Sequence, residues 1–276
     1  MDFLQYAFSS HQLLELSHQS VEVVSLVNQT MLEKLERDET EPGQHDQSSL
    51  AHLSRLAESE IQRDFPLLHS HSLVGLWGAL EACMSDIFIG WIEHLDSSEW
   101  TPPMRKLKVQ LSEWLALPEA DRSPWLLDQI RRDRSSDLKS GIQQFESVLS
   151  AIGLDGSVDP AIREVMFQVK SLRNVIAHKG GRVDARFVED CPSFKLSVGD
   201  DLRLSNTQIE AANTTMVLYV KSVLDRIRSR AGEGPYESEP SYPGNITSTE
   251  DLRTLILPSE ISKGELGVSP GLSSDE

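Results

Sequence analysis

Cysteine and basic residues are scarce in this chain. The 276 residues include only two cysteines, Cys83 and Cys191, which are too few for a disulfide framework and form no Cys-x-x-Cys pair of the kind found in zinc ribbons. Lysine and arginine total 26 against 43 acidic residues, so the formal net charge is −17. This charge argues against broad, non-specific wrapping of nucleic acid or of an anionic membrane surface, but not against a local basic site.

Several familiar sequence signals are also missing. The chain has no Gly-x-Gly-x-x-Gly, P-loop or Gly-x-Ser-x-Gly pattern, which argues against nucleotide-driven chemistry and against α/β-hydrolase chemistry. The N-terminal residues lack the basic and apolar regions of a signal peptide, so we expect a cytoplasmic protein.

The most apolar stretch, residues 73–92, has about the length of a membrane span. Glu81 and Asp86 lie inside it, and a carboxylate at the centre of a bilayer costs about 2.5–3.5 kcal/mol. We therefore predict a buried helix and no membrane partner. A buried Glu81 needs a polar partner, and Arg173, a helix-capping contact and a hydroxyl group are the alternatives.

The hydrophobic spacing predicts an all-α fold. Apolar residues recur every three or four positions, which indicates amphipathic helices. The predicted helices cover residues 11–36, 50–63, 73–95, 104–117, 124–134, 137–152, 160–179 and 206–230. Alternating apolar and polar residues at 194–198 and 202–204, on either side of Gly199, predict a small β-hairpin before the last helix.

Three regions follow from this pattern. Residues 1–49 form an N-terminal helix and loop, and this helix either extends a dimer interface or covers the bundle. Residues 50–230 form the main helical domain. Residues 231–276 form an acidic tail that we expect to be disordered, because nine acidic residues face only two basic ones between 232 and 276, among five prolines and six glycines.

One group of residues suggests chemistry, and it lies at the end of the helix that begins at Pro160. Asn174 and His178 are four residues apart and share a helix face with Lys170, one turn earlier. Arg173 lies at the border between this face and the apolar stripe. His178 comes just before Gly180 and Gly181, at a helix C-terminus, where the helix dipole favours a positive charge.

The same segment is a basic island in an acidic chain. Residues 163–187 carry a net charge of +4, which suggests a local anion site such as one for phosphate. The alternative is that the last turn of a helix attracts cations for dipole reasons alone. The charged residues of the segment are Arg163, Lys170, Arg173, Lys179, Arg182 and Arg186, opposed by Glu164 and Asp184.

Residues 172–178 (LRNVIAH) resemble the Arg-x-x-x-x-His motif of the HEPN superfamily, the higher eukaryote and prokaryote nucleotide-binding domains. The polar residue after the arginine is part of this likeness. Residues 181–184 and the apolar run at 76–81 are similar to the corresponding parts of several bacterial HEPN groups. The resemblance covers roughly residues 65–228 and implies a HEPN-type helical bundle.

The resemblance also implies a function. Many HEPN proteins are metal-independent endoribonucleases that act as homodimers, with two motifs meeting in a composite cleft, and many are toxins, stress-response enzymes or anti-phage defence effectors. Arg173 would then bind the scissile phosphate, Asn174 would orient it, and His178 would act as general acid or base. Lys170, Lys179, Arg182 and Arg186 would bind RNA phosphates. The products would carry 2′,3′-cyclic phosphate ends, and an antitoxin or another regulatory protein would be a further partner.

Two other functions remain open at this point. One is a non-catalytic HEPN module that binds RNA, nucleotide or a protein. The other is a helical scaffold in which Arg173 and His178 are structural. We expect no metal and no cofactor, because RNA supplies its own nucleophile, the 2′-hydroxyl group, and needs only proton transfer and a cation. The pair His69 and His71 has no further metal ligand at a suitable spacing.

Overall fold

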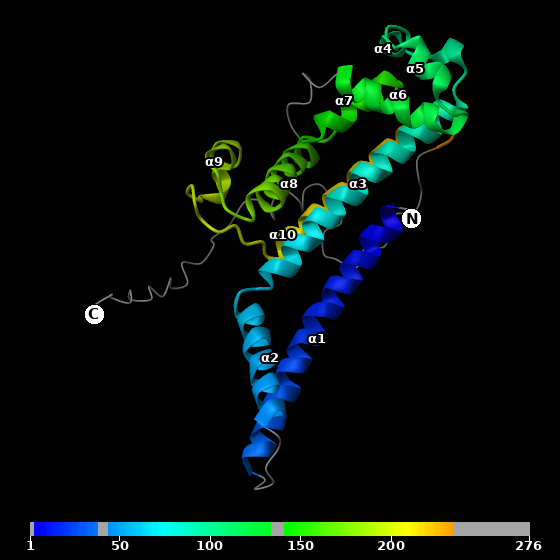
Figure 1. Ribbon diagram of the computed structural model, residues 1–276. Helices are drawn as coiled ribbons and strands as arrows, with labels where there is room; N and C mark the ends of the chain where they lie inside the picture. Colours follow the sequence, from blue (N-terminus) through cyan, green and yellow to red (C-terminus); the bar gives the residue numbers. More distant parts are fainter. Residues whose placement is uncertain (1–2, 38–43, 134–140, 235–276) are drawn as a thin grey trace.

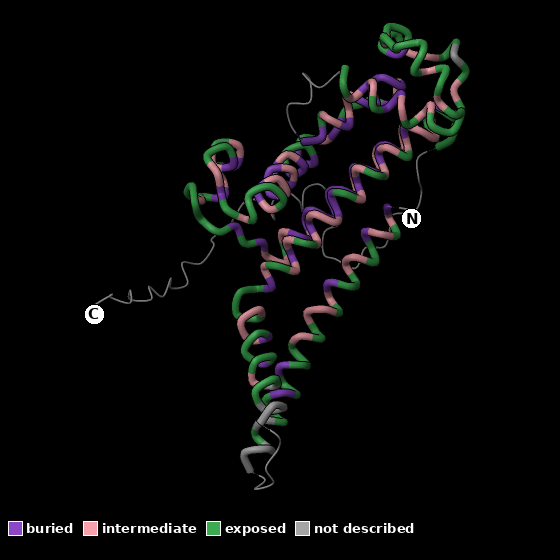
Figure 2. Tube along the Cα trace, in the orientation of Figure 1, coloured by how far each residue is buried: buried purple, intermediate pink, exposed green. Residues whose placement is uncertain are grey.

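The computed structural model describes residues 3–37, 44–133 and 141–234, which fold into helices with no named strand among them. The body is built on three long helices, α3 (Pro66–His94), α8 (Pro160–Lys179) and α10 (Asn206–Arg230). Helix α3 contacts both α8 and α10, and buried residues follow the faces on which they meet (Figure 2). The all-α prediction is confirmed.

Helix α3 is the apolar helix expected from the sequence, although it begins at Pro66 rather than at residue 73. It is long and apolar enough to cross a membrane by those two criteria alone. In the structure its large side chains enter the core, and Trp77, Leu80 and Phe88 are almost completely buried. Burying side chains of this size supplies much of the hydrophobic stabilisation of the body.

Shorter helices cover the C-terminal end of α3 (Figure 1). They are α4 (Pro102–Arg105), α5 (Leu111–Ala116), α6 (Glu119–Asp133) and α7 (Gln143–Ala151), with the 3-10 turn η1 (Ser97–Glu99) before them. The helix predicted over 104–117 is therefore two separate short helices. Trp114 of α5 packs on Trp125 of α6, with ring centroids 5.7 Å apart.

Local capping signals fix the ends of α8 and α10 where the sequence predicts them. The Asp159 carboxylate accepts a hydrogen bond from the Ala161 amide, 2.7 Å away, and Pro160 occupies the first turn of α8. Gly180 ends α8 in the left-handed conformation with φ of 60°. Ser205 and Gln208 form a capping box at the start of α10.

The predicted β-hairpin is not found in the described part of the chain. Residues 192–194 form the 3-10 turn η2 (Pro192–Phe194), and the residues around Gly199 pair with the segment that follows α8. Val183 donates to the Asp200 carbonyl and Leu202 donates to the Gly181 carbonyl, and Arg182 and Asp201 form an isolated bridge. Helix α9 (Ala185–Asp190) lies between these two segments in the sequence.

Helices α1 (Phe3–Arg37) and α2 (Gln44–Gln62) lie side by side as an arm that projects from the body (Figure 1). The first turns of α1 cover the bundle, since Phe3, Ala7 and Leu14 are buried there. The loop expected over 38–49 is shorter than predicted, because α2 already begins at Gln44. The rest of that loop, and the predicted tail from residue 235 onward, lie outside the described residues.

Candidate functional site

Helix α8 carries the three predicted catalytic residues to its exposed C-terminal end. Arg173 and Asn174 are partly buried, whereas His178 is exposed. The left-handed Gly180 ends the helix two residues after His178, which leaves the imidazole at the edge of the body. Helix α8 is capped at both ends, by Asp159 and by Gly180, so the backbone that carries these side chains is held in place.

The guanidinium group of Arg173 joins the other two residues. Its Nη1 donates to Oδ1 of Asn174 over 3.3 Å and lies 3.4 Å from Nε2 of His178. The second contact is a hydrogen bond only when Nε2 of His178 carries no proton, because arginine has no acceptor. Nε of Arg173 is buried and has no partner among the described residues. An unpaired buried donor is costly, and an incoming anion offers it an acceptor.

Lys170 lies one helical turn before Asn174 on α8, and its ammonium is influenced by the charges of two arginines. Burial lowers the pKa of the Lys170 ammonium, and the nearby charges of Arg186 and Arg173 lower it further, while Glu81 opposes them. Three positive charges are therefore close enough to influence one another, those of Lys170 and Arg173 on α8 and that of Arg186 on α9. Like charges at close range disfavour one another, and a bound anion relieves that repulsion.

The outer cations of the basic island are already paired. Lys179 lies 3.8 Å from Asp184, Arg182 lies 3.9 Å from Asp201, and Arg186 lies 3.5 Å from Asp190. Counting Asp190 and Asp201 with residues 163–187 reduces the net charge from +4 to +2. These pairs are solvent-exposed and hence weak, so the cations can exchange their carboxylates for phosphates. Within the basic island, Arg173 and Lys170 are thus partly buried, whereas Lys179, Arg182 and Arg186 are exposed.

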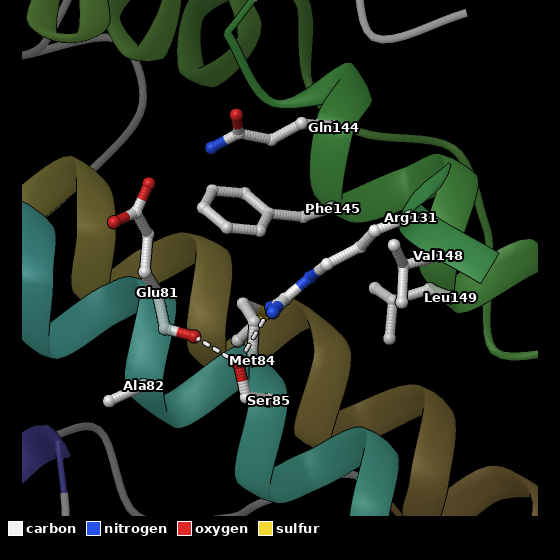
Figure 3. A pocket seen from close by; sticks show the side chains of 9 residues that line it. All are labelled: Glu81, Ala82, Met84, Ser85, Arg131, Gln144, Phe145, Val148 and Leu149. Atoms are coloured by element: carbon white, nitrogen blue, oxygen red, sulfur yellow. Dashed lines mark hydrogen bonds between the residues drawn. The ribbon is translucent and has the colours of Figure 1, made fainter. Parts of the chain in front are cut away.

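Glu81 has a partner other than Arg173. Its Oε1 accepts a hydrogen bond from the Trp77 indole, 2.8 Å away, on the same helix. Glu81 also lines a hollow of about 390 Å³ between α3, α6 and α7. Figure 3 shows Arg131 of α6 reaching across this hollow to Ser85, to which it donates over 2.7 Å.

The pair His69 and His71 is split by helix geometry. His69 is fully buried, with Nδ1 2.7 Å from the Leu204 carbonyl and Nε2 3.2 Å from Nε2 of His18 on α1. His71 is exposed on another side of α3. Burial lowers the pKa of His18, and the neighbouring His69 lowers it further. His69 therefore joins α1 to the body.

Comparison of the chain with protein-family models, with curated proteins and with solved structures finds no match. The functional argument therefore rests on the residues themselves. Sequence reasoning missed the proximity of Arg186 to Lys170, and it missed the hollow beside Glu81. Both depend on which helices pack together, and no local spacing signals that packing.

Proposed function

We propose that this protein is a metal-independent endoribonuclease of HEPN type that acts as a homodimer, in the role of a toxin, a stress-response enzyme or a defence effector. The observation that carries the proposal is the contact between Arg173 and His178 on an accessible surface, with Asn174 as a third member. A purely structural histidine is expected to be buried against a carboxylate or a carbonyl group. His178 instead is exposed, and its contact is with a cation.

The geometry suits cleavage by the RNA's own 2′-hydroxyl group. His178 of one protomer takes the proton from the 2′-oxygen, which attacks the adjacent phosphorus and forms a 2′,3′-cyclic phosphate. The phosphorus–5′-oxygen bond breaks, and the second protomer's copy of the motif donates a proton to that leaving oxygen. Arg173 and Lys170 stabilise the negative charge that develops on the phosphorane.

A second copy is needed because one chain provides one such histidine. The two-fold symmetry of a homodimer supplies a second imidazole in the same geometry. The Arg173–His178 contact requires the tautomer in which Nε2 carries no proton, and this lone pair becomes available to the 2′-hydroxyl proton when Arg173 turns from His178 to the phosphate.

Cleavage of RNA in the presence of EDTA tests the proposal. We expect the purified protein to cut single-stranded RNA without added metal and to leave 2′,3′-cyclic phosphate ends, identified by mass spectrometry. The matched control is the same sequence with 2′-deoxyribose throughout, which lacks the nucleophile and is expected to stay intact. Products with 3′-hydroxyl ends, or cleavage of the deoxy control, would rule the mechanism out. Binding of the RNA without cleavage would favour the non-catalytic module.

A further inference from the structure

A cluster of possible metal ligands joins α1 to α10, away from the motif on α8. His11 and Glu15 on α1 and Glu210 on α10 each bring one ligand atom within 4.8 Å of the others. All three residues are partly buried. No lysine or arginine in the described part of the chain forms an ion pair with Glu15 or Glu210. The two carboxylates therefore lack a compensating cation there.

A buried amide side chain, that of Asn213, lines a hollow next to His11 and Glu210. Asn213 is 3% exposed, and its Nδ2 donates to the Ala7 carbonyl over 3.3 Å. Its Oδ1 is buried and has no partner among the described residues. Asn213 lines a hollow of about 10 Å³ together with His11 and Glu210, which is room for one water molecule or one ion. Such an oxygen can accept a hydrogen bond from a bound water molecule or coordinate an ion.

The helix positions hold these groups in a fixed arrangement. His11 and Glu15 are four residues apart on α1, and Glu210 and Asn213 are three apart on α10, so each pair shares a helix face. The Asn206 amide donates to Oε1 of Glu210 over 2.9 Å, which orients the carboxylate and leaves its second oxygen free. A partner that orients a ligand in this way is typical of metal sites.

We propose that His11, Glu15, Glu210 and Asn213 bind one divalent transition-metal ion of the Zn²⁺ type. One imidazole nitrogen and two carboxylate oxygens are ligands that zinc accepts. In this proposal the amide oxygen of Asn213 takes the fourth position. The ion clamps the first turns of the arm to the last helix of the body. It lies on α1 and α10 and takes no part in the chemistry of Arg173 and His178, so either proposal stands or falls without the other.

Isothermal titration of Zn²⁺ into full-length protein tests the site, after EDTA treatment and desalting. We expect about one equivalent to bind and the thermal unfolding midpoint to rise with the Zn²⁺ concentration. His11→Gln and Glu210→Gln are each expected to weaken binding at least about tenfold, the loss that even an outer partner of a metal site causes. His71→Gln is the matched control, because His71 is an exposed histidine elsewhere, and it is expected to bind as the parent does.

The unfolding midpoints in EDTA show whether each variant folds. Two results would overturn the proposal. One is an EDTA-treated parent that binds no Zn²⁺. The other is parental affinity in both His11→Gln and Glu210→Gln, because the ion would then be held by other residues.

A second, independent observation concerns the outer face of the arm. Six aliphatic residues of α1 form an exposed stripe, each between 42% and 63% exposed. They lie on the side of α1 opposite the buried Ala7, Leu14 and Ser25. Together with Ser20 they follow one another at steps of three or four positions, apart from the adjacent Val23 and Val24, and none carries a charge; this spacing is close to that of a coiled-coil seam. The residues of this α1 stripe are Leu13, Leu16, Val23, Val24, Val27 and Met31.

The α1 stripe continues into a hollow between α1 and α2. This hollow of about 280 Å³ is lined by Val24 of the stripe and by Leu53, Leu56 and Ala57 of α2, among others. Side chains of another helix could pack into this hollow. Six half-exposed aliphatic residues amount to roughly 500 Å² of apolar surface, which is in the range of the largest patch on a typical monomer, about 300–600 Å². That is also about the apolar share of one side of a standard dimer interface.

We infer that the arm of a second copy packs on the α1 stripe, so that the two hairpins form a four-helix bundle. A self-complementary stripe of this area meets the need of a two-fold dimer without another protein. Sedimentation of full-length protein tests this inference. The parent is expected to be a dimer at micromolar concentration, and Leu16→Asp with Val23→Asp is expected to weaken the dimer at least about a hundredfold, because two charges would be buried in each copy.

Leu111→Asp with Leu115→Asp is the matched control, since it adds the same charge at two exposed leucines of α5, away from the arm. This control is expected to stay dimeric. A monomeric parent, or a stripe variant that dimerises as the parent does, would disprove the inference. Circular dichroism of both pairs checks that the arm remains helical.

Discussion

Replacing Glu146 by alanine is expected to lower the free energy of unfolding by about 3–5 kcal/mol, the usual cost of removing one partner of a buried ion pair. Oε1 and Oε2 of Glu146 each accept a hydrogen bond of 3.0 Å from Nη1 of Arg226. Oε1 also accepts from the Tyr219 hydroxyl over 2.9 Å. The side chains of Arg226 and Glu146 are only 16% and 17% exposed, so the arginine would lose its carboxylate out of reach of bulk water.

The position of this network explains the size of the effect. Glu146 lies on α7, whereas Tyr219 and Arg226 lie on α10, so the three side chains join a short covering helix to the core. Burial raises the pKa of the Tyr219 phenol, and the charge of Glu146 raises it further, so the hydroxyl keeps its proton and remains a donor. Arg226 also donates to the Leu154 carbonyl over 3.1 Å, which ties the loop after α7 to the same point.

Urea unfolding followed by circular dichroism measures the change. Glu164→Ala is the matched control, because Glu164 is an exposed glutamate on α8, and it is expected to stay within about 0.5 kcal/mol of the parent. Tyr219→Phe removes a donor and leaves the ion pair, so it is expected to cost about 1 kcal/mol. A Glu146→Ala loss no larger than that of Tyr219→Phe would show that the pair with Arg226 contributes little.

Local sequence signals predicted the helices whose ends are set by neighbouring residues. The Asp159-Pro160 start and the Gly180 stop operate within one turn, and α8 has the predicted bounds. Helix α10 also has the predicted bounds, and its Ser205 cap was found only in the structure. The hairpin prediction failed for the opposite reason. Apolar and polar residues do alternate over 194–204, but residues 199–202 form backbone hydrogen bonds with residues 181–183 and not with each other across a hairpin. The alternation alone does not predict which segment these residues pair with.

The candidate sites also differ in how far the sequence could predict them, depending on whether their residues are close in the chain. Arg173, Asn174 and His178 lie within two turns of one helix, so the sequence predicted that they share a surface. The approach of Arg186 to Lys170, and of Glu210 to His11, depends on contacts between distant helices. The net charge of the basic island is also lower in the structure than the charge counted for residues 163–187. Asp190 and Asp201 lie outside that range but form ion pairs with Arg186 and Arg182.

Replacing His178 by alanine is expected to reduce the rate of RNA cleavage by about 10²–10⁴-fold, the contribution of one positioned general acid or base. Replacing Arg173 by lysine is expected to reduce it by about a hundredfold or more. Lysine keeps the positive charge but is a point charge without the planar fork, so it cannot hold Asn174 and His178 through one nitrogen and present others to phosphate. A charge-only role for Arg173 predicts a much smaller loss.

Single-turnover cleavage in EDTA measures both variants against His71→Ala, an exposed histidine on α3 whose replacement is expected to leave the rate unchanged. Full cleavage by folded His178→Ala would remove the motif from the chemistry, even if the parent is a ribonuclease. The salt dependence of RNA binding separates the two remaining roles of Arg173. If Arg173 binds phosphate, Arg173→Ala should bind RNA less tightly and show a shallower dependence on salt, by about one released counterion for each site. If Arg173 only orients His178, binding and its salt dependence stay the same and the rate alone falls.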